Sequence, residues 1–203
     1  MTQLILASQS PRRKALLQQL GIPFEIKPSS IDEHSLTRDP LSLVRELSLT
    51  KANDIANKCT NTVVIGADTI VVHNDEILGK PSTEYQAAQM LAQLSGNQHQ
   101  VYTGVCLQYV DGQGNLQEPV LFHEETKVWF QALSAFPIHQ YIASGSPMDK
   151  AGAYGIQDDW GAIFVKKIEG DYYNVVGLPL SRCYLELSAL KERYKLTLQL
   201  STL

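Results

Sequence analysis

The sequence contains little cysteine and no long apolar run. Its three cysteines, Cys59, Cys106 and Cys183, lie far apart and have no histidine at metal-ligand spacing, which argues against a disulfide framework and against a zinc site. No apolar stretch approaches the roughly 20 residues that a membrane-spanning helix needs. The run at residues 4–7 is too short for a signal peptide, and arginines follow it instead of preceding it. We therefore expect a cytoplasmic protein that does not bind a membrane.

Basic charge is also scarce. The formal net charge is −4 at pH 7, whereas proteins that neutralise many phosphates usually carry a clear basic surplus. We expect no stable complex with nucleic acid. The Walker loop and the G-x-G-x-x-G fingerprint are missing as well, and with them the commonest phosphate-binding folds. Any phosphate chemistry must therefore be local and must use another scaffold.

The composition that remains is typical of a globular protein. With 44% hydrophobic and 19% charged residues among 203, the chain can bury a substantial core as one domain, or as two lobes that share a sheet. Caps and apolar periodicity predict helices that begin near residues 11, 40, 84, 137 and 180. Strands are predicted at residues 4–7, 62–72, 76–78, 99–110, 126–130 and 163–165. This alternation favours a mixed α/β fold.

Two arginines stand at the start of the first predicted helix. Ser10 and Pro11 resemble an N-cap and a first helical residue, so Arg12 and Arg13 fall in the first turn, where positive charge opposes the helix dipole. A bound phosphate would compensate them, with Ser8 and Ser10 as further donors. Two solvated arginines on an exposed turn are the alternative.

Asp68 interrupts an otherwise apolar strand. A carboxylate buried there without a partner would cost several kcal/mol, so we expect a metal ion, a lysine or backbone donors beside it. The small residues Gly66 and Ala67 predict room for a ligand next to it. A structural aspartate in a bulge is the alternative, and we favour a catalytic or metal-binding role over it.

Two lysines are candidates for the same chemistry. Lys51 lies on the apolar stripe of the second predicted helix, from which a lysine either reaches water or meets a phosphate or a carboxylate. Lys80 lies in a Gly-Lys-Pro turn, which a bound phosphate and a plain surface loop explain equally well. Glu33 is an acidic loop residue that would matter only as a second carboxylate for a metal.

The segment at residues 149–157 combines charges, glycines, an aromatic ring and an amide without clean periodicity. Glycines let backbone approach a ligand, and the amide of Gln157 can pair with both a donor and an acceptor on a base edge. A glycine-rich connection with solvated charges is the alternative. The pattern indicates a candidate binding loop.

Six ordered blocks of the sequence together resemble the Maf family. They extend over residues 4 to about 190, and although each is weak alone, their order is specific. The blocks are L-A-S-Q-S-P-R-R at residues 6–13, G-A-D-T at 66–69, G-K-P at 79–81, H-Q-V-Y-T-G at 99–104, D-K-A-G-A-Y-G-I-Q at 149–157 and N-V-V-G-L-P at 174–179.

The resemblance implies a fold, a reaction and roles for particular residues. It implies a mixed α/β fold with a central sheet, flanking helices and two lobes around a cleft, similar to inosine triphosphate pyrophosphatases, within a single domain at residues 1–203. It implies hydrolysis of a nucleoside triphosphate between the α- and β-phosphates. Asp68 matches the family's proton acceptor, while Arg12, Thr69 and Gln157 match positions associated with substrate choice. The combination resembles the branch that acts on dTTP and UTP, and the branch that prefers 7-methyl-GTP is the nearest alternative.

These observations predict how the reaction would work. Mg²⁺ or Mn²⁺, bound through Asp68 with Glu33 as the second candidate ligand, would neutralise phosphate oxygens and activate water. Arg12, Arg13, Lys51 and Lys80 would hold the phosphates. Which carboxylate is ligand and which is base stays open, as does a homodimer. The rival functions are a nucleotide-binding regulator of cell division without turnover and a nucleic-acid-binding protein.

Overall fold

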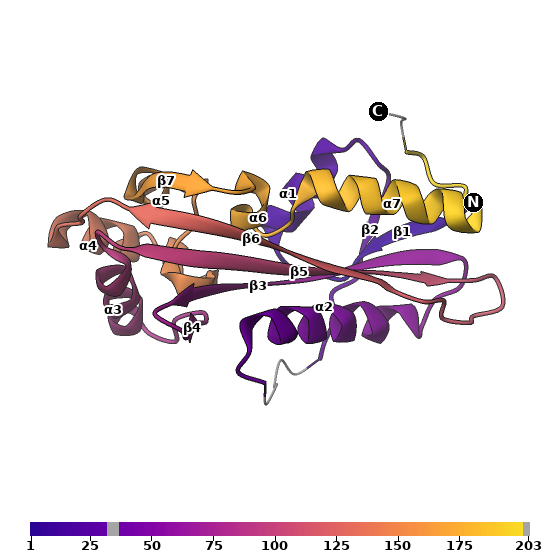
Figure 1. Cartoon of the computed structure of the whole chain (residues 1–203), viewed down its shortest axis with the longest axis horizontal. Helices are drawn as coiled ribbons and strands as arrows, with labels where there is room; N and C mark the ends of the chain where they lie inside the picture. Colours follow the sequence, from indigo (N-terminus) through magenta and orange to yellow (C-terminus); the bar gives the residue numbers. More distant parts are fainter. Residues whose placement is uncertain (32–36, 201–203) are drawn as a thin grey trace. The chain divides into compact units, whose positions relative to one another are not determined.

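The structure, a computed structural model, describes residues 1–31 and 37–200 of the chain and is drawn in Figure 1. A 7-stranded mixed sheet with the order β2-β1-β3-β5-β6-β7 contains every strand, and β4 pairs with β3 outside this path. The strands are β1 (Gln3–Leu6), β2 (Glu25–Ile26), β3 (Thr62–His73), β4 (Glu76–Leu78), β5 (Gln98–Val110), β6 (Val120–Phe130) and β7 (Val165–Glu169). β1 is parallel to β2 and β3, whereas the pairs β3–β4 and β6–β7 are antiparallel.

Helices flank the sheet. They are α1 (Pro11–Gln19), α2 (Pro40–Ala56), α3 (Glu84–Leu94), α4 (Ala135–Ala143), α5 (Asp159–Phe164), α6 (Tyr172–Val176) and α7 (Leu180–Tyr194), with 3-10 turns η1 (Ser146–Asp149) and η2 (Ala151–Ala153). The mixed α/β fold with flanking helices predicted from the sequence is confirmed. In the described residues no helix is long and apolar enough to span a bilayer.

Contacts within the chain define two compact units. The first comprises Met1–Asp68, Thr103–His123 and Gly177–Leu203, and the second comprises Thr69–Tyr102 and Glu124–Val176. The division falls within β3, β5 and β6, so each of these strands contributes residues to both units.

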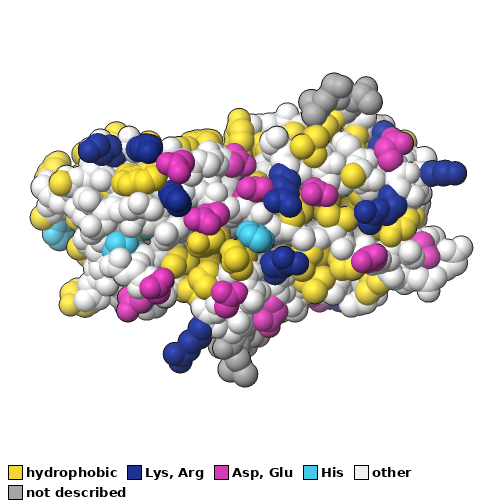
Figure 2. All heavy atoms as spheres, in the orientation of Figure 1, with side chains coloured by type: hydrophobic (Ala, Val, Ile, Leu, Met, Phe, Trp, Pro, Cys, Tyr) yellow, Lys and Arg dark blue, Asp and Glu magenta, His cyan; other side chains and the backbone are white. Residues whose placement is uncertain are grey.

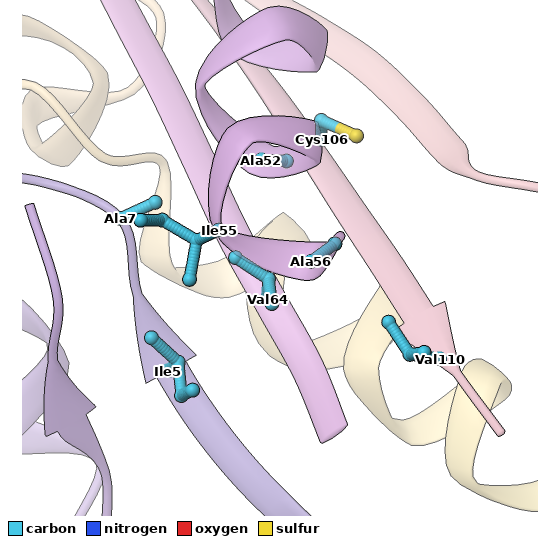
Figure 3. Packing of buried hydrophobic residues seen from close by; sticks show 8 residues of the cluster. All are labelled: Ile5, Ala7, Ala52, Ile55, Ala56, Val64, Cys106 and Val110. Carbon is cyan, nitrogen blue, oxygen red and sulfur yellow. The ribbon is translucent and has the colours of Figure 1, made fainter. Parts of the chain in front are cut away.

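In the first unit, α2 packs on one face of the sheet and approaches the strand backbone directly at two glycines. A Cβ atom at Gly66 of β3 would collide with the Ser48 carbonyl of α2, and one at Gly104 of β5 would collide with the Val44 carbonyl. Around these contacts lies a cluster of small and branched apolar residues, shown in Figure 3: Ile5, Ala7, Ala52, Ile55, Ala56, Val64, Cys106 and Val110. The glycines therefore set how closely helix and sheet approach.

The opposite face of the same strands carries α7. Side chains alternate along a strand, so Tyr109 points away from α2, and its ring lies 5.0 Å from that of Tyr194 at the end of α7. Near the two ends of the described chain, Thr2 N–H donates to Thr197 Oγ1 at 2.7 Å and Thr197 N–H donates to Thr2 Oγ1 at 3.2 Å. Both faces of this part of the sheet are thus covered.

The second unit has an aromatic core beneath α3 and α4, which pack together. His99 is fully buried, lies edge-on against Phe130 and Tyr154, and its Nε2 is 2.7 Å from the Tyr154 hydroxyl. The hairpin β3–β4 turns at Asn74 and Asp75, both in the left-handed region with φ of 48° and 62°, as the Asn-Asp pair predicts.

One predicted strand is partly wrong. Ile163 and Phe164 complete α5, and β7 begins only at Val165. A short apolar triplet does not distinguish strand from buried helix by periodicity, and Phe164 is fully buried from its helical position. Thr83 caps α3, since its side chain accepts from Gln86 N–H, and the Gln86 amide oxygen accepts from Ser82 N–H.

Charges on the molecule are mixed in sign. On the face shown in Figure 2, basic and acidic side chains are interspersed, and no continuous basic stripe crosses it.

Candidate active site

The first unit contains a buried ion pair. Lys51 Nζ of α2 lies 2.5 Å from Asp68 Oδ1 of β3, and each side chain is only 10% exposed. Asp68, the strand carboxylate that was expected to need a partner, is therefore paired with a lysine, which is one of the three expected kinds of partner. A pair of this kind is costly to break, because removing either partner leaves an uncompensated buried charge, with a penalty of about 3–5 kcal/mol.

Two local features of the sequence bring this pair together. Val64, Gly66 and Asp68 share one face of β3 because side chains alternate along a strand, and that face carries α2. Lys51 lies on the buried stripe of α2. The expectation that Gly66 leaves room for a ligand is wrong, because the Ser48 carbonyl and the Ala52 backbone nitrogen of α2 fill that space. Gly66 lets the helix come close enough for lysine to reach aspartate.

α1 begins a few residues after the carboxyl end of β1, which is parallel to β3. β1 pairs with β3 up to Leu6 and Ile65, and Ala7 N–H still donates to the Ile65 carbonyl at 2.8 Å. Buried Ser8 comes next, and Ser10 caps α1 by accepting from Arg13 N–H, as predicted. Ligands commonly bind at the carboxyl ends of parallel strands.

Of the two arginines at the start of α1, Arg13 holds two segments of the chain together by hydrogen bonds. Its Nε donates to the Gly177 carbonyl at 2.8 Å and its Nη1 donates to Ser8 Oγ at 3.4 Å, so it connects α1 to the segment that precedes α7. The Gly177 partner could not be identified from sequence, because it lies 164 positions away. Arg12 is half-buried in the same turn.

The second unit contains Thr69, Lys80 and Gln157. Thr69 is half-buried directly after Asp68, whereas Lys80 and Gln157 are exposed. The Gly-Lys-Pro turn adjoins the predicted binding loop, because Gly152 N–H donates to the Gly79 carbonyl at 3.0 Å. The structure therefore brings two of the sequence blocks together within this unit.

A buried lysine in the predicted binding loop was missed. Lys150 is 7% exposed, and its Nζ donates to Asp149 Oδ1 and Asp158 Oδ2, both at 2.8 Å, and to the Ser146 carbonyl. Burial lowers the pKa of Lys150, but hydrogen bonds to the two carboxylates outweigh it, so the pKa is raised. A charged residue among glycines is normally solvated, and nothing in the local sequence predicts otherwise.

The described residues supply few ligands for a metal. They contain no group of three or more His, Cys, Asp or Glu side chains that could hold an ion. Asp68 offers a carboxylate, and one oxygen of it is engaged by Lys51. Mg²⁺ often binds through one or two carboxylates together with substrate phosphates and waters, and Asp68 fits that arrangement. Glu33, the other predicted ligand, lies outside the described residues.

Comparison with known proteins decides the family. The family model described as "Maf-like protein" matches residues 3–190. The chain belongs to the Maf family. The resemblance seen in the six sequence blocks is confirmed, and the family assignment covers Asp68, Lys51 and the loop at residues 149–157 alike.

Several Maf relatives cover almost the whole chain. A protein of Geobacillus named dTTP/UTP pyrophosphatase is 53% identical over 191 residues, which are 94% of this chain and 99% of the relative. Proteins of the same name from Symbiobacterium thermophilum and Bacillus cereus are 51% and 49% identical, over 90% and 92% of this chain and 91% and 95% of their own lengths.

Proposed function

We propose that the chain hydrolyses dTTP and UTP to the nucleoside monophosphate and pyrophosphate. The observation that carries this proposal is the buried Asp68–Lys51 pair, 2.5 Å apart, in which Asp68 lies on β3 just beyond Ile65, the last β3 residue paired with β1. Maf relatives at about half identity are named dTTP/UTP pyrophosphatase, which supports both the reaction and the substrates.

Asp68 is the proposed proton acceptor. A water oxygen bonds to the α-phosphorus, the bond from that phosphorus to the bridging oxygen breaks, pyrophosphate leaves, and the water proton passes to the Asp68 carboxylate. Lys51 holds the carboxylate in one orientation and places positive charge where the phosphate oxygens gain negative charge.

The remaining candidates would bind the substrate. Ser8 and Arg12, at the start of α1, suit phosphate oxygens because a helix N-terminus and a guanidinium both favour anions, and Lys80 adds an exposed ammonium. Arg13 supports Ser8 in this scheme, since it already donates to that hydroxyl. Thr69 and Gln157 would read the base.

A divalent cation, Mg²⁺ or Mn²⁺, completes the proposed site. Asp68 would hold it together with phosphate oxygens, and Glu33 is the predicted second ligand. When bound, the ion screens the charge of the triphosphate and lowers the pKa of a coordinated water. Because the described residues provide no closed ligand set, we expect Mn²⁺ alone to bind weakly in calorimetry and much more tightly with a non-hydrolysable UTP analogue.

The proposed setting is the cytoplasm, where nucleotides are made and used. Cys59, Cys106 and Cys183 are all free thiols, as a reducing compartment would keep them. The partner is the nucleoside triphosphate, and a homodimer is the assembly to test by light scattering.

Identification of both products in labelled water tests the reaction. The purified protein is incubated with Mg²⁺ and dTTP or UTP in water enriched in heavy oxygen, and products are identified by mass spectrometry. We expect one labelled oxygen in the monophosphate and none in pyrophosphate. Label in pyrophosphate, or release of orthophosphate with a diphosphate, would contradict attack at the α-phosphorus. A clear preference for 7-methyl-GTP in the same assay would overturn the base assignment alone.

A pair of matched substitutions tests the residue. Asp68→Asn is nearly isosteric but can neither accept the proton nor bind a cation equally well, so kcat should fall by at least about a hundredfold, the scale of general base catalysis. Asp75→Asn makes the same chemical change in the exposed β3–β4 turn and should leave kcat unchanged. Near-normal kcat for a folded Asp68→Asn would show that Asp68 is structural.

A further inference from the structure

The side-chain amide of Gln157 has a defined orientation. Its Nε2 donates to Asp158 Oδ1 at 2.9 Å. A carboxylate only accepts hydrogen bonds, so the amino group of Gln157 must face Asp158 and the amide oxygen must face the other way. Among the described residues no donor is bonded to that oxygen, and the side chain is exposed. Gln157 therefore presents its amide oxygen, an acceptor, on the side that faces away from Asp158.

Asp158 is itself fixed from several sides. Its Oδ2 accepts from Lys150 Nζ at 2.8 Å and from Ser146 Oγ at 3.3 Å. Its backbone N–H donates to the Gly155 carbonyl at 3.1 Å. The Oδ1 atom is thereby left to Gln157, and rotation of the carboxylate would break the contact with buried Lys150.

The contact between Lys150 and Asp158 requires a glycine at position 155. A Cβ atom at Gly155 would lie 2.5 Å from Asp158 Oδ2 and 2.8 Å from Lys150 Cε. Its backbone is not in the left-handed region, so space and not conformation explains this glycine. The loop is built around the Lys150–Asp158 contact.

We propose that Asp158 is a positioning residue that orients the Gln157 amide and thereby selects uracil and thymine over cytosine at ring position N3. The inference rests on the proposed function, in which Gln157 reads the base. Uracil and thymine carry N3–H, a donor that matches the amide oxygen, whereas N3 of cytosine is an acceptor that would face it. A mismatch of this kind leaves polar groups unpaired, and discrimination of about ten- to a hundredfold is expected from it.

Asp158→Asn should shift the base preference from UTP toward CTP, instead of lowering activity on both nucleotides. The oxygen of the introduced amide would go to the charged Lys150, which leaves its amino group facing Gln157. Gln157 would then turn its own oxygen toward that amino group and its amino group toward the ligand. We expect kcat/KM for UTP to fall about tenfold or more, mainly through KM, and kcat/KM for CTP to rise. A merely structural loss would lower both values.

Two further variants separate orientation from general damage. Asp149→Asn alters the other carboxylate bound to Lys150, whereas the Gln157 amide donates to Asp158, and it should keep the UTP/CTP ratio of the unmodified protein. Asp158→Ala frees the Gln157 amide to rotate, so the ratio should approach that of Gln157→Ala. Circular dichroism confirms that each variant is folded before its ratio is measured.

The unmodified protein provides a test that does not depend on a variant folding. A UTP analogue methylated at N3 lacks the donor and should be a poor substrate, and Gln157→Ala should remove most of that penalty. Equal kcat/KM for UTP and its N3-methyl analogue, or an unchanged UTP/CTP ratio in folded Asp158→Asn, would overturn the inference. Failure of the unmodified protein to convert UTP to the monophosphate would instead overturn the proposed function.

Discussion

The Lys51–Asp68 pair combines a structural and a chemical task in two side chains. Both are about nine-tenths buried, so each charge depends on the other for compensation, while the proposed reaction also uses them. Stability and turnover should therefore respond differently to single and double substitutions.

A double-mutant cycle makes that difference measurable. Lys51→Met leaves Asp68 buried and unpaired and should reduce the free energy of unfolding by about 3 kcal/mol or more, whereas Lys51→Met with Asp68→Asn should regain most of the loss. Neither protein should hydrolyse UTP. Urea denaturation measures the stabilities, and a double variant no more stable than Lys51→Met would show that the penalty is not electrostatic.

The role of an individual residue could be predicted from sequence where a charged side chain falls at a position expected to be buried. Asp68 in an apolar strand and Lys51 on an apolar helix stripe both needed a partner, and the structure pairs them. Arg13 was predicted to bind phosphate, and the structure shows that it also donates to the Gly177 carbonyl and to Ser8 Oγ. Lys150 and Asp158 were missed because a loop has no periodicity that indicates which charges are buried.

At the scale of elements, the stability of the fold requires direct contact between α2 and the sheet. Gly66→Ala places a methyl group against the Ser48 carbonyl and the Ala52 backbone nitrogen, which can yield only by moving the helix. We expect a loss of about 2 kcal/mol or more in stability. UTP hydrolysis should also fall, because Lys51 moves with α2.

Gly112→Ala is the matched control for that substitution. No atom lies within 4 Å of a Cβ built at Gly112, and its φ is not in the left-handed region. Its stability, measured by thermal unfolding, should change by less than about 0.5 kcal/mol. Equal effects of the two substitutions would show that close approach at Gly66 is unimportant.

Elements with strong boundary signals were predicted well. Ser10-Pro11 and Asp39-Pro40 begin α1 and α2, as expected from caps followed by proline. The two-residue strand β2 and the five-residue helix α6 are too short for periodicity to reveal them. Residues 163 and 164 were wrongly assigned to a strand for the same reason, since only the structure shows that they belong to α5.

For the whole molecule, buried His99 predicts sensitivity to acid. Burial, with a smaller contribution from His73, lowers the pKa of His99 to about 3, against about 6.5 in an unfolded chain. The unfolded state therefore binds a proton first as pH falls, so stability is full above about pH 6.5 and is lost from there toward pH 3, by up to 1.36 kcal/mol per pH unit for one proton.

Urea denaturation at pH 7 and pH 5 checks this expectation. His99→Gln removes the titration, so it should be less stable than the unmodified protein at pH 7 but should lose less stability on the change to pH 5. His139→Gln alters an exposed histidine and should keep the original pH dependence. Identical slopes for His99→Gln and the unmodified protein would contradict the assignment.

The alternation of Val64, Gly66 and Asp68 toward α2 has a consequence for how β3 can change. Gly66 and Asp68 must lie an even number of positions apart to face the same side of β3, so the proposed catalytic role of Asp68 depends on this spacing. Insertion or deletion of one residue between Gly66 and Asp68 would turn the carboxylate to the opposite face of the sheet, away from Lys51. Length variation in this family should therefore be tolerated in turns such as that at Asp111 and strictly avoided within β3.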